Sequence, residues 1–92
     1  MGTHQLPDTV HDQIMRHLLL RGPYGRTSPE LEELTGMKHQ TVSSTLREME
    51  LTGYITKCAE QRNGCHAYVA ALIARLMPQS ALLPPNPHRE SY

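Results

Sequence analysis

The feature of this sequence that most constrains its fold is a Thr35-Gly36 step between two short stretches with helical periodicity. Before the step, Leu31 and Leu34 lie three residues apart and are expected on the inner face of one helix. After the step, apolar residues recur at helical spacing at Met37, Val42, Leu46 and Met49. Because glycine tolerates the left-handed conformation in which helices commonly end, the step predicts a tight turn between two helices.

The outer face of the second predicted helix, over residues 38–51, is polar and slightly basic. It carries Lys38, His39, Gln40, Thr41, Ser43, Ser44 and Arg47. A tight turn followed by a helix with such a face is typical of a helix-turn-helix, whose second helix enters the major groove of DNA. There Arg pairs with guanine, Gln pairs with adenine, and Ser or Thr bonds a base edge or a phosphate.

The position of each polar residue along this helix suggests its role. Since the N-terminal turns of a recognition helix penetrate deepest, contacts to bases are expected from His39, Gln40, Ser43 and Ser44. Thr41 and Arg47 are expected nearer the DNA backbone. Lys38 and the helix N-terminus are expected to hold a phosphate.

A β-hairpin is predicted shortly after this helix. Asn63-Gly64 is a strong signal for a two-residue turn, and strand-like residues precede it at 54–58 and follow it at 66–69. Lys57 and Arg62 bracket the hairpin and are candidates for contact with a flanking minor groove or phosphate, Arg62 being the stronger. Pairing of Arg62 with Cys65 would place Cys58 opposite Val69, which disfavours a disulfide.

The remaining elements complete a small domain. Asp8 is the expected cap of a first helix over residues 8–21, and a second helix is expected to begin at Thr27 or Ser28, followed by Pro29. The inner side of the first helix carries Val10, Ile14 and Leu18, with Met15 and Leu19 as further candidates.

Three regions follow from this pattern: an N-terminal arm over residues 1–7, a domain over residues 8–77, and a Pro-rich tail over residues 78–92 that is expected to be disordered or extended. Residues 70–77 form either a short fourth helix, which the composition favours, or a continuation of the last strand. Ninety-two residues suit one compact domain.

The predicted fold is mainly α with a small β-hairpin. The order helix, helix, recognition helix, hairpin resembles the winged helix-turn-helix family over roughly residues 8–72. The most specific segment is Gly36-Met-x-x-x-Thr-Val-Ser-x-x-Leu-Arg-Glu-Met-Glu-x-x-Gly-Tyr-Ile55, which looks like the second half of the winged helix in MarR-like regulators and small phage-encoded DNA-binding proteins. The runs Lys38–Ser43 and Arg62–Ala67 look closest to the phage type. The resemblance implies a sequence-specific transcriptional regulator that binds double-stranded DNA, often as a homodimer on a palindromic site.

The charge balance leaves a second function open. Nine Lys and Arg offset nine Asp and Glu, so the chain as a whole has no bias toward a polyanion. This neutrality favours an alternative in which the winged helix is a protein-interaction module that binds and inhibits a host protein. The face of the recognition helix favours DNA, because its residues are small and hydrogen-bonding and lack the aromatic anchors of protein hot spots.

The sequence lacks the motifs of enzymes, of metal-binding proteins and of membrane proteins. No Gly-rich phosphate loop, Ser-His-Asp order or pair of acids in a predicted cleft points to an enzyme. Cys58, Cys65 and His66 lack a second ligand pair at zinc spacing, so no metal or cofactor is expected. The apolar runs fall short of the ~20 residues that span a bilayer, and the N-terminus does not resemble a signal peptide. A cytoplasmic location is therefore expected.

Overall fold

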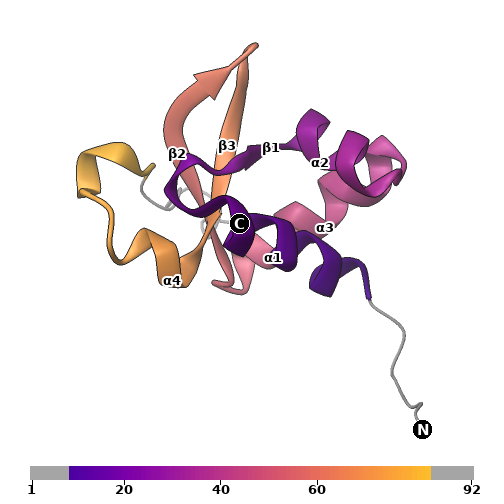
Figure 1. The fold of residues 1–92 in the computed structure, drawn as a ribbon, viewed down its shortest axis with the longest axis horizontal. Helices are drawn as coiled ribbons and strands as arrows, with labels where there is room; N and C mark the ends of the chain where they lie inside the picture. The colour runs from indigo at the N-terminus through magenta and orange to yellow at the C-terminus, as the bar shows by residue number, and fades with distance from the viewer. Residues whose placement is uncertain (1–8, 84–92) are drawn as a thin grey trace, which may run out of the picture.

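The computed structural model describes residues 9–83 and has the predicted winged-helix architecture (Figure 1). In chain order its elements are α1 (Val10–Arg21), the 3-10 turn η1 (Gly22–Tyr24), β1 (Arg26–Thr27), α2 (Ser28–Thr35), α3 (His39–Leu51), β2 (Ile55–Arg62), β3 (Cys65–Ala70), α4 (Ala71–Ala74) and the 3-10 turn η2 (Gln79–Ala81). The fold class predicted from the sequence is confirmed.

Side-chain caps fix the starts of α1 and α2. The Thr9 hydroxyl accepts a hydrogen bond from the Asp12 backbone N–H and caps α1; the predicted cap, Asp8, and the predicted arm over residues 1–7 lie outside the described residues. Thr27 caps α2 in a capping box: its hydroxyl accepts from the Glu30 N–H, and the Glu30 carboxylate accepts from the Thr27 N–H. Of the two caps considered for α2, the structure selects Thr27.

The turn between α2 and α3 is held by glycine and threonine. Gly36 has φ 73° and ψ 10°, the left-handed conformation that the sequence predicted. The Thr35 hydroxyl donates to the Leu31 carbonyl oxygen at 2.7 Å and accepts from the Met37 N–H at 3.2 Å. The exit from α2 and the approach to α3 are therefore fixed by the same side chain.

The main core lies between α1, α2, α3 and one face of the sheet. Its buried members are Ile14, Leu18, Leu31, Val42, Leu46, Met49, Ile55 and Ala70. Leu34 and Leu19, expected on inner faces, are 44% and 46% exposed. Since residues advance by ~100° around a helix, Leu34 lies about 60° from Leu31, and Leu19 lies about 100° from Leu18. Both positions fall at the edge of the narrow stripes that these short helices bury.

The sheet is antiparallel with strand order β1-β3-β2. Arg62 pairs with Cys65 as predicted, around a turn in which Asn63 and Gly64 have positive φ. The register shifts between Lys57 and Gln61, so Val69 pairs with Thr56.

The expectation that Cys58 lies opposite Val69 is therefore wrong, because a bulge interrupts the pairing. The carbonyl oxygen of Cys58 instead accepts a hydrogen bond from His66 Nδ1 at 2.9 Å. Cys58 and Cys65 are both free cysteines. Burial raises the pKa of the Cys58 thiol.

A second cluster covers the other face of the sheet. It contains Cys58, Ala67, Val69 and Ala74, with Ile73, Met77 and Leu82 packed against it. Figure 1 shows α4 and the following segment on the side of the hairpin away from α2 and α3. The helix at α4 is shorter than the predicted span of residues 70–77.

The segment after Pro78, predicted to be disordered or extended, instead folds back onto β2. After η2, Leu82 forms a β-bridge with Cys58, and the Leu83 N–H donates to the Lys57 carbonyl oxygen at 2.9 Å. β2 is an edge strand with backbone groups open to pairing, and Met77 and Leu82 add apolar contacts, which together offset the entropy of ordering this segment. Residues 84–92 of the predicted tail lie outside the described residues.

Gly25 and Gly36 have similar φ angles but differ in the space that a Cβ atom would find. Gly25 has φ 71° and ψ 179°, a region essentially restricted to glycine, and a Cβ there would lie 2.6 Å from the Tyr68 carbonyl oxygen. A Cβ at Gly36 meets nothing within 4 Å. Gly25→Ala is expected to lower the free energy of unfolding by about 3 kcal/mol or more, and Gly36→Ala by about 1 to 2 kcal/mol. Urea denaturation followed by circular dichroism measures both; equal losses would contradict the packing described around β3.

Candidate nucleic-acid interface

The outer face of α3 is a continuous polar surface. Val42, Leu46 and Met49 are at most 1% exposed and fix the helix against the core. The opposite face carries most of the predicted site residues, and a depression of about 440 Å³ on it is lined by His39, Gln40, Ser43, Ser44 and Arg47. The structure therefore brings together five of the residues selected from the sequence.

The N-terminal turn of α3 begins at Lys38. Lys38 is the N-cap residue, with extended backbone angles and no side-chain cap hydrogen bond, and its carbonyl oxygen accepts from the Val42 N–H. Its side chain is exposed. Backbone N–H groups at such a terminus point outward with the positive end of the helix dipole, which suits an anion.

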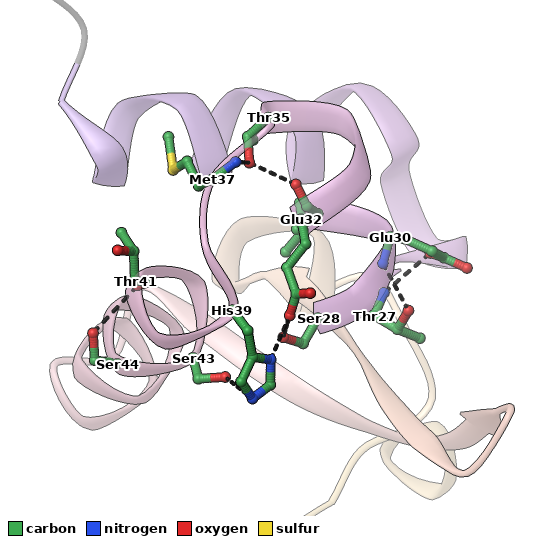
Figure 2. A network of polar contacts seen from close by, with 11 residues as sticks. Thr27, Ser28, Glu30, Glu32, Thr35, Met37, His39, Thr41, Ser43 and Ser44 are labelled. Carbon is green, nitrogen blue, oxygen red and sulfur yellow. Dashed lines mark hydrogen bonds and ion pairs between the residues drawn. The ribbon is translucent and has the colours of Figure 1, made fainter.

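His39 is held by a carboxylate from the preceding helix (Figure 2). Its Nδ1 lies 2.6 Å from Glu32 Oε2, and its Nε2 lies 3.4 Å from Ser43 Oγ. Because a carboxylate only accepts, Nδ1 carries the proton and donates to Glu32, while Nε2 faces the Ser43 hydroxyl. Glu32 also accepts from the Ser28 hydroxyl at 3.3 Å. The imidazole is thus oriented by α2 while its side chain stays 74% exposed.

The hydroxyl groups of α3 are partly used within the helix. The Ser44 hydroxyl donates to the Thr41 carbonyl oxygen at 3.2 Å, so its oxygen keeps only acceptor capacity for an external donor. Thr41 is half-buried, as is Ser43. Arg47 is exposed and lines the depression.

Lys57 lies apart from this surface. It pairs with Tyr68 across β2 and β3, near the end of the hairpin that is remote from the Asn63-Gly64 turn. Its ammonium group lies 5.8 Å from the centroid of the Tyr68 ring, and the residue is half-buried. Lys57 is therefore not at the tip of the wing.

Arg62 differs most from its expected place. The sequence suggested a wing residue facing nucleic acid, but its side chain is only 14% exposed and points into the protein. Nε donates to Glu30 Oε2 at 3.1 Å, Nη2 to Glu30 Oε1 and the Gly25 carbonyl oxygen at 2.9 Å each, and Nη1 to the Tyr24 carbonyl oxygen at 3.0 Å. The Arg62 hydrogen bond holds the pKa of the Glu30 carboxyl below its ordinary value, and Glu30 in turn raises the pKa of Arg62.

Three residues important to this geometry were missed from the sequence: Tyr24, Glu30 and Glu32. The Thr27-x-x-Glu30 spacing of a capping box was present and places Glu30 at the start of α2. The partners of Glu30 and Glu32 lie across turns or in distant segments, and no local pattern marks them.

Among residues 9–83, no group of three or more His, Cys, Asp or Glu is placed to hold a metal ion. None of the helices described is long and apolar enough to cross a membrane.

The fold and the outward polar helix define a winged helix-turn-helix protein. A sequence profile of the MarR family matches residues 4–64, and the chain belongs to this family. No curated protein and no solved structure matched the chain. Members of the MarR family are DNA-binding transcriptional regulators rather than enzymes, so membership implies a regulator of that class.

The Arg62–Glu30 pair predicts acid sensitivity. A carboxyl whose pKa is lowered in the folded state stabilises the fold above its unfolded-state pKa, and this contribution is lost as the pH falls through the lower, folded-state value. Between about pH 5 and about pH 3, the urea concentration at which half of the protein is unfolded is expected to decrease as the pH falls. This decrease is expected to be steeper for the wild-type protein than for Glu30→Gln.

Arg62→Met provides the control for this experiment. In that background the largest cause of the Glu30 shift is gone, so adding Glu30→Gln should change the pH profile much less. An equal effect of Glu30→Gln in both backgrounds would show that Arg62 is not the cause.

Proposed function

We propose that this protein is a sequence-specific regulator that inserts α3 into the major groove of double-stranded DNA. The observation that carries the proposal is the convergence of His39, Gln40, Ser43, Ser44 and Arg47 on one exposed depression, on a helix whose opposite face is fully buried. These side chains offer the donors and acceptors that distinguish base pairs in the major groove.

The proposed contacts follow from the chemistry and exposure of each residue. Arg47 pairs with guanine or with the adjacent backbone, and Gln40 makes paired hydrogen bonds to adenine. His39, presented by Glu32, offers its Nε2 edge, and Ser43 and Ser44 bond base edges nearby. Lys38 and the first N–H groups of α3 bind a phosphate, with Thr41 beside the backbone.

The salt dependence of binding should be modest. Of the cations assigned to DNA from the sequence, Lys38 and Arg47 lie on the exposed face of α3, whereas Arg62 is engaged inside the protein and Lys57 lies away from the wing tip. Each neutralised phosphate contributes a slope of about −0.9 to log K against log salt. A small number of phosphate contacts per protomer is therefore proposed.

Substitutions on α3 test this interface. Gln40→Ala and Arg47→Ala are each expected to weaken binding to a preferred duplex by about 1 to 3 kcal/mol, and Lys38→Ala to reduce the salt slope by about 1. Electrophoretic mobility shifts at two salt concentrations, on a duplex selected by the wild-type protein from a random pool, provide the measurement. Arg75→Ala, which removes an exposed cation at the end of α4, is the matched control. Wild-type affinity in all three α3 variants would refute the assignment.

We also propose that the protein acts as a homodimer, as MarR family members typically do. Leu20, Leu72 and Leu76 are 79%, 65% and 84% exposed. They lie at the end of α1 and in and after α4, two helices that both contact η1. Burial of these leucines by a second copy would remove apolar surface from water and place two α3 helices on one palindromic site.

Charges in place of these leucines test dimer formation. The double variant Leu20→Glu/Leu76→Glu is expected to weaken self-association about tenfold or more, because a carboxylate would be desolvated at the contact. Sedimentation velocity over a concentration series measures this. Leu34→Glu, at an exposed leucine of α2, should leave self-association unchanged; a monomeric wild-type protein at every concentration would overturn the proposal.

A phage origin, a host protein target and a cytoplasmic location stay predictions from the sequence. Binding to DNA places the protein in the compartment that holds its operator. Selection from random duplexes separates the two proposed ligands, because enrichment of a palindrome is expected for a dimeric regulator and no enrichment for a protein-binding module.

A further inference from the structure

The cluster around Arg62 joins segments that are far apart in the sequence. Arg62 is the last residue of β2, directly before the turn of the hairpin. Its guanidinium bonds both carboxylate oxygens of Glu30 in the first turn of α2 and the carbonyl oxygens of Tyr24 and Gly25 in the loop before β1. One side chain thus connects the wing tip with the start of the helix-turn-helix.

Glu30 gives this connection its rigidity. Besides accepting from Arg62, its carboxylate accepts the Thr27 N–H in the capping box of α2. The position of the Glu30 carboxylate is therefore tied to the backbone at the start of α2. Since Arg62 bonds it through two parallel hydrogen bonds, the planar guanidinium has one favoured orientation.

An aromatic ring covers the same group. The Cζ atom of Arg62 lies 4.0 Å from the centroid of the Tyr24 ring, and that of Arg21, at the end of α1, lies 4.2 Å from it. Tyr24 shields Arg62 from solvent and links it to α1. Turning Arg62 outward to a phosphate would break four hydrogen bonds and this contact, and would leave the Glu30 carboxylate without its cation.

We propose that Arg62 is a positioning residue: it fixes the wing relative to α2 and α3, and it supports DNA binding without touching DNA. The part of this inference that concerns DNA binding rests on the proposed function. It replaces the sequence-based expectation that Arg62 contacts a phosphate or the minor groove. The wing then meets DNA through its backbone and the exposed side chains of Gln61 and Asn63.

The first arm of the test uses the free protein. Hydrogen exchange of the amides at residues 61–65 is measured in wild type, Arg62→Met, Arg62→Lys and Glu30→Gln. All three variants are expected to exchange about tenfold faster at the wing, because Lys keeps the charge but not the paired donors, while α3 amides keep their protection. Wild-type exchange at the wing in all three variants would overturn the proposal. If Arg62→Met does not fold, Arg62→Lys and Glu30→Gln carry the comparison.

The second arm uses a duplex selected by the wild-type protein from a random pool. Arg62→Lys and Arg62→Met are expected to lose affinity three- to tenfold at every salt concentration, with the salt slope unchanged within about 0.3. Hydroxyl-radical protection should disappear in the flanking minor groove and remain at the site of α3. Glu30→Gln should give the same pattern, and the Glu30→Gln/Arg62→Met double variant should be no weaker than either single variant.

A different pattern would identify Arg62 as a phosphate contact. In Arg62→Met the slope of log K against log salt would be smaller by about 1, whereas Arg62→Lys and Glu30→Gln would both bind the duplex with wild-type affinity. Failure of the proposed function is distinguishable from failure of this inference. If no duplex is bound by the wild-type protein, the DNA function fails, and the exchange experiment alone still decides whether Arg62 fixes the wing.

Discussion

Burial of one face of α3 is the interaction on which the rest of the structure depends. A helix of 13 residues is marginal in water by itself, so its stability comes from packing. Val42, Leu46 and Met49, with Thr45 beside them, are enclosed by α1, α2 and the sheet. Because this packing fixes the rotation of the helix, the polar residues at the intervening positions are presented together on the opposite side.

The elements around α3 were predictable because their signals are local. Helical spacing identified Ile14 and Leu18 of α1 and Val42, Leu46 and Met49 of α3 as buried. Thr27 or Ser28 followed by Pro29 marked the start of α2, and Gly36 marked its end. Asn63-Gly64 gave the hairpin and the pairing of Arg62 with Cys65. Each of these features depends on residues within one or two turns of chain, where intrinsic conformational preferences act.

The features that sequence analysis missed depend on distant partners. The bulge in β2 is supported by a hydrogen bond from His66 to the Cys58 carbonyl, and the segment after Pro78 is ordered by the open edge of the same strand. Arg62 shows the same limit most clearly, because its carboxylate partner lies 32 residues away. A lone arginine beside a turn has the same local pattern whether it faces DNA or the interior.

The inward Arg62 also changes how a neutral protein would achieve specific binding. With this cation used inside the fold, the proposed interface has few charges with which to attract DNA of any sequence, so nonspecific affinity should be low. Discrimination then depends on base contacts from α3, which require accurate placement of the helix and wing. A second copy increases affinity without more charge, because once one protomer is bound the second binds at a high effective concentration. Rigid positioning and dimerisation would therefore compensate for the electrostatic attraction that the chain lacks.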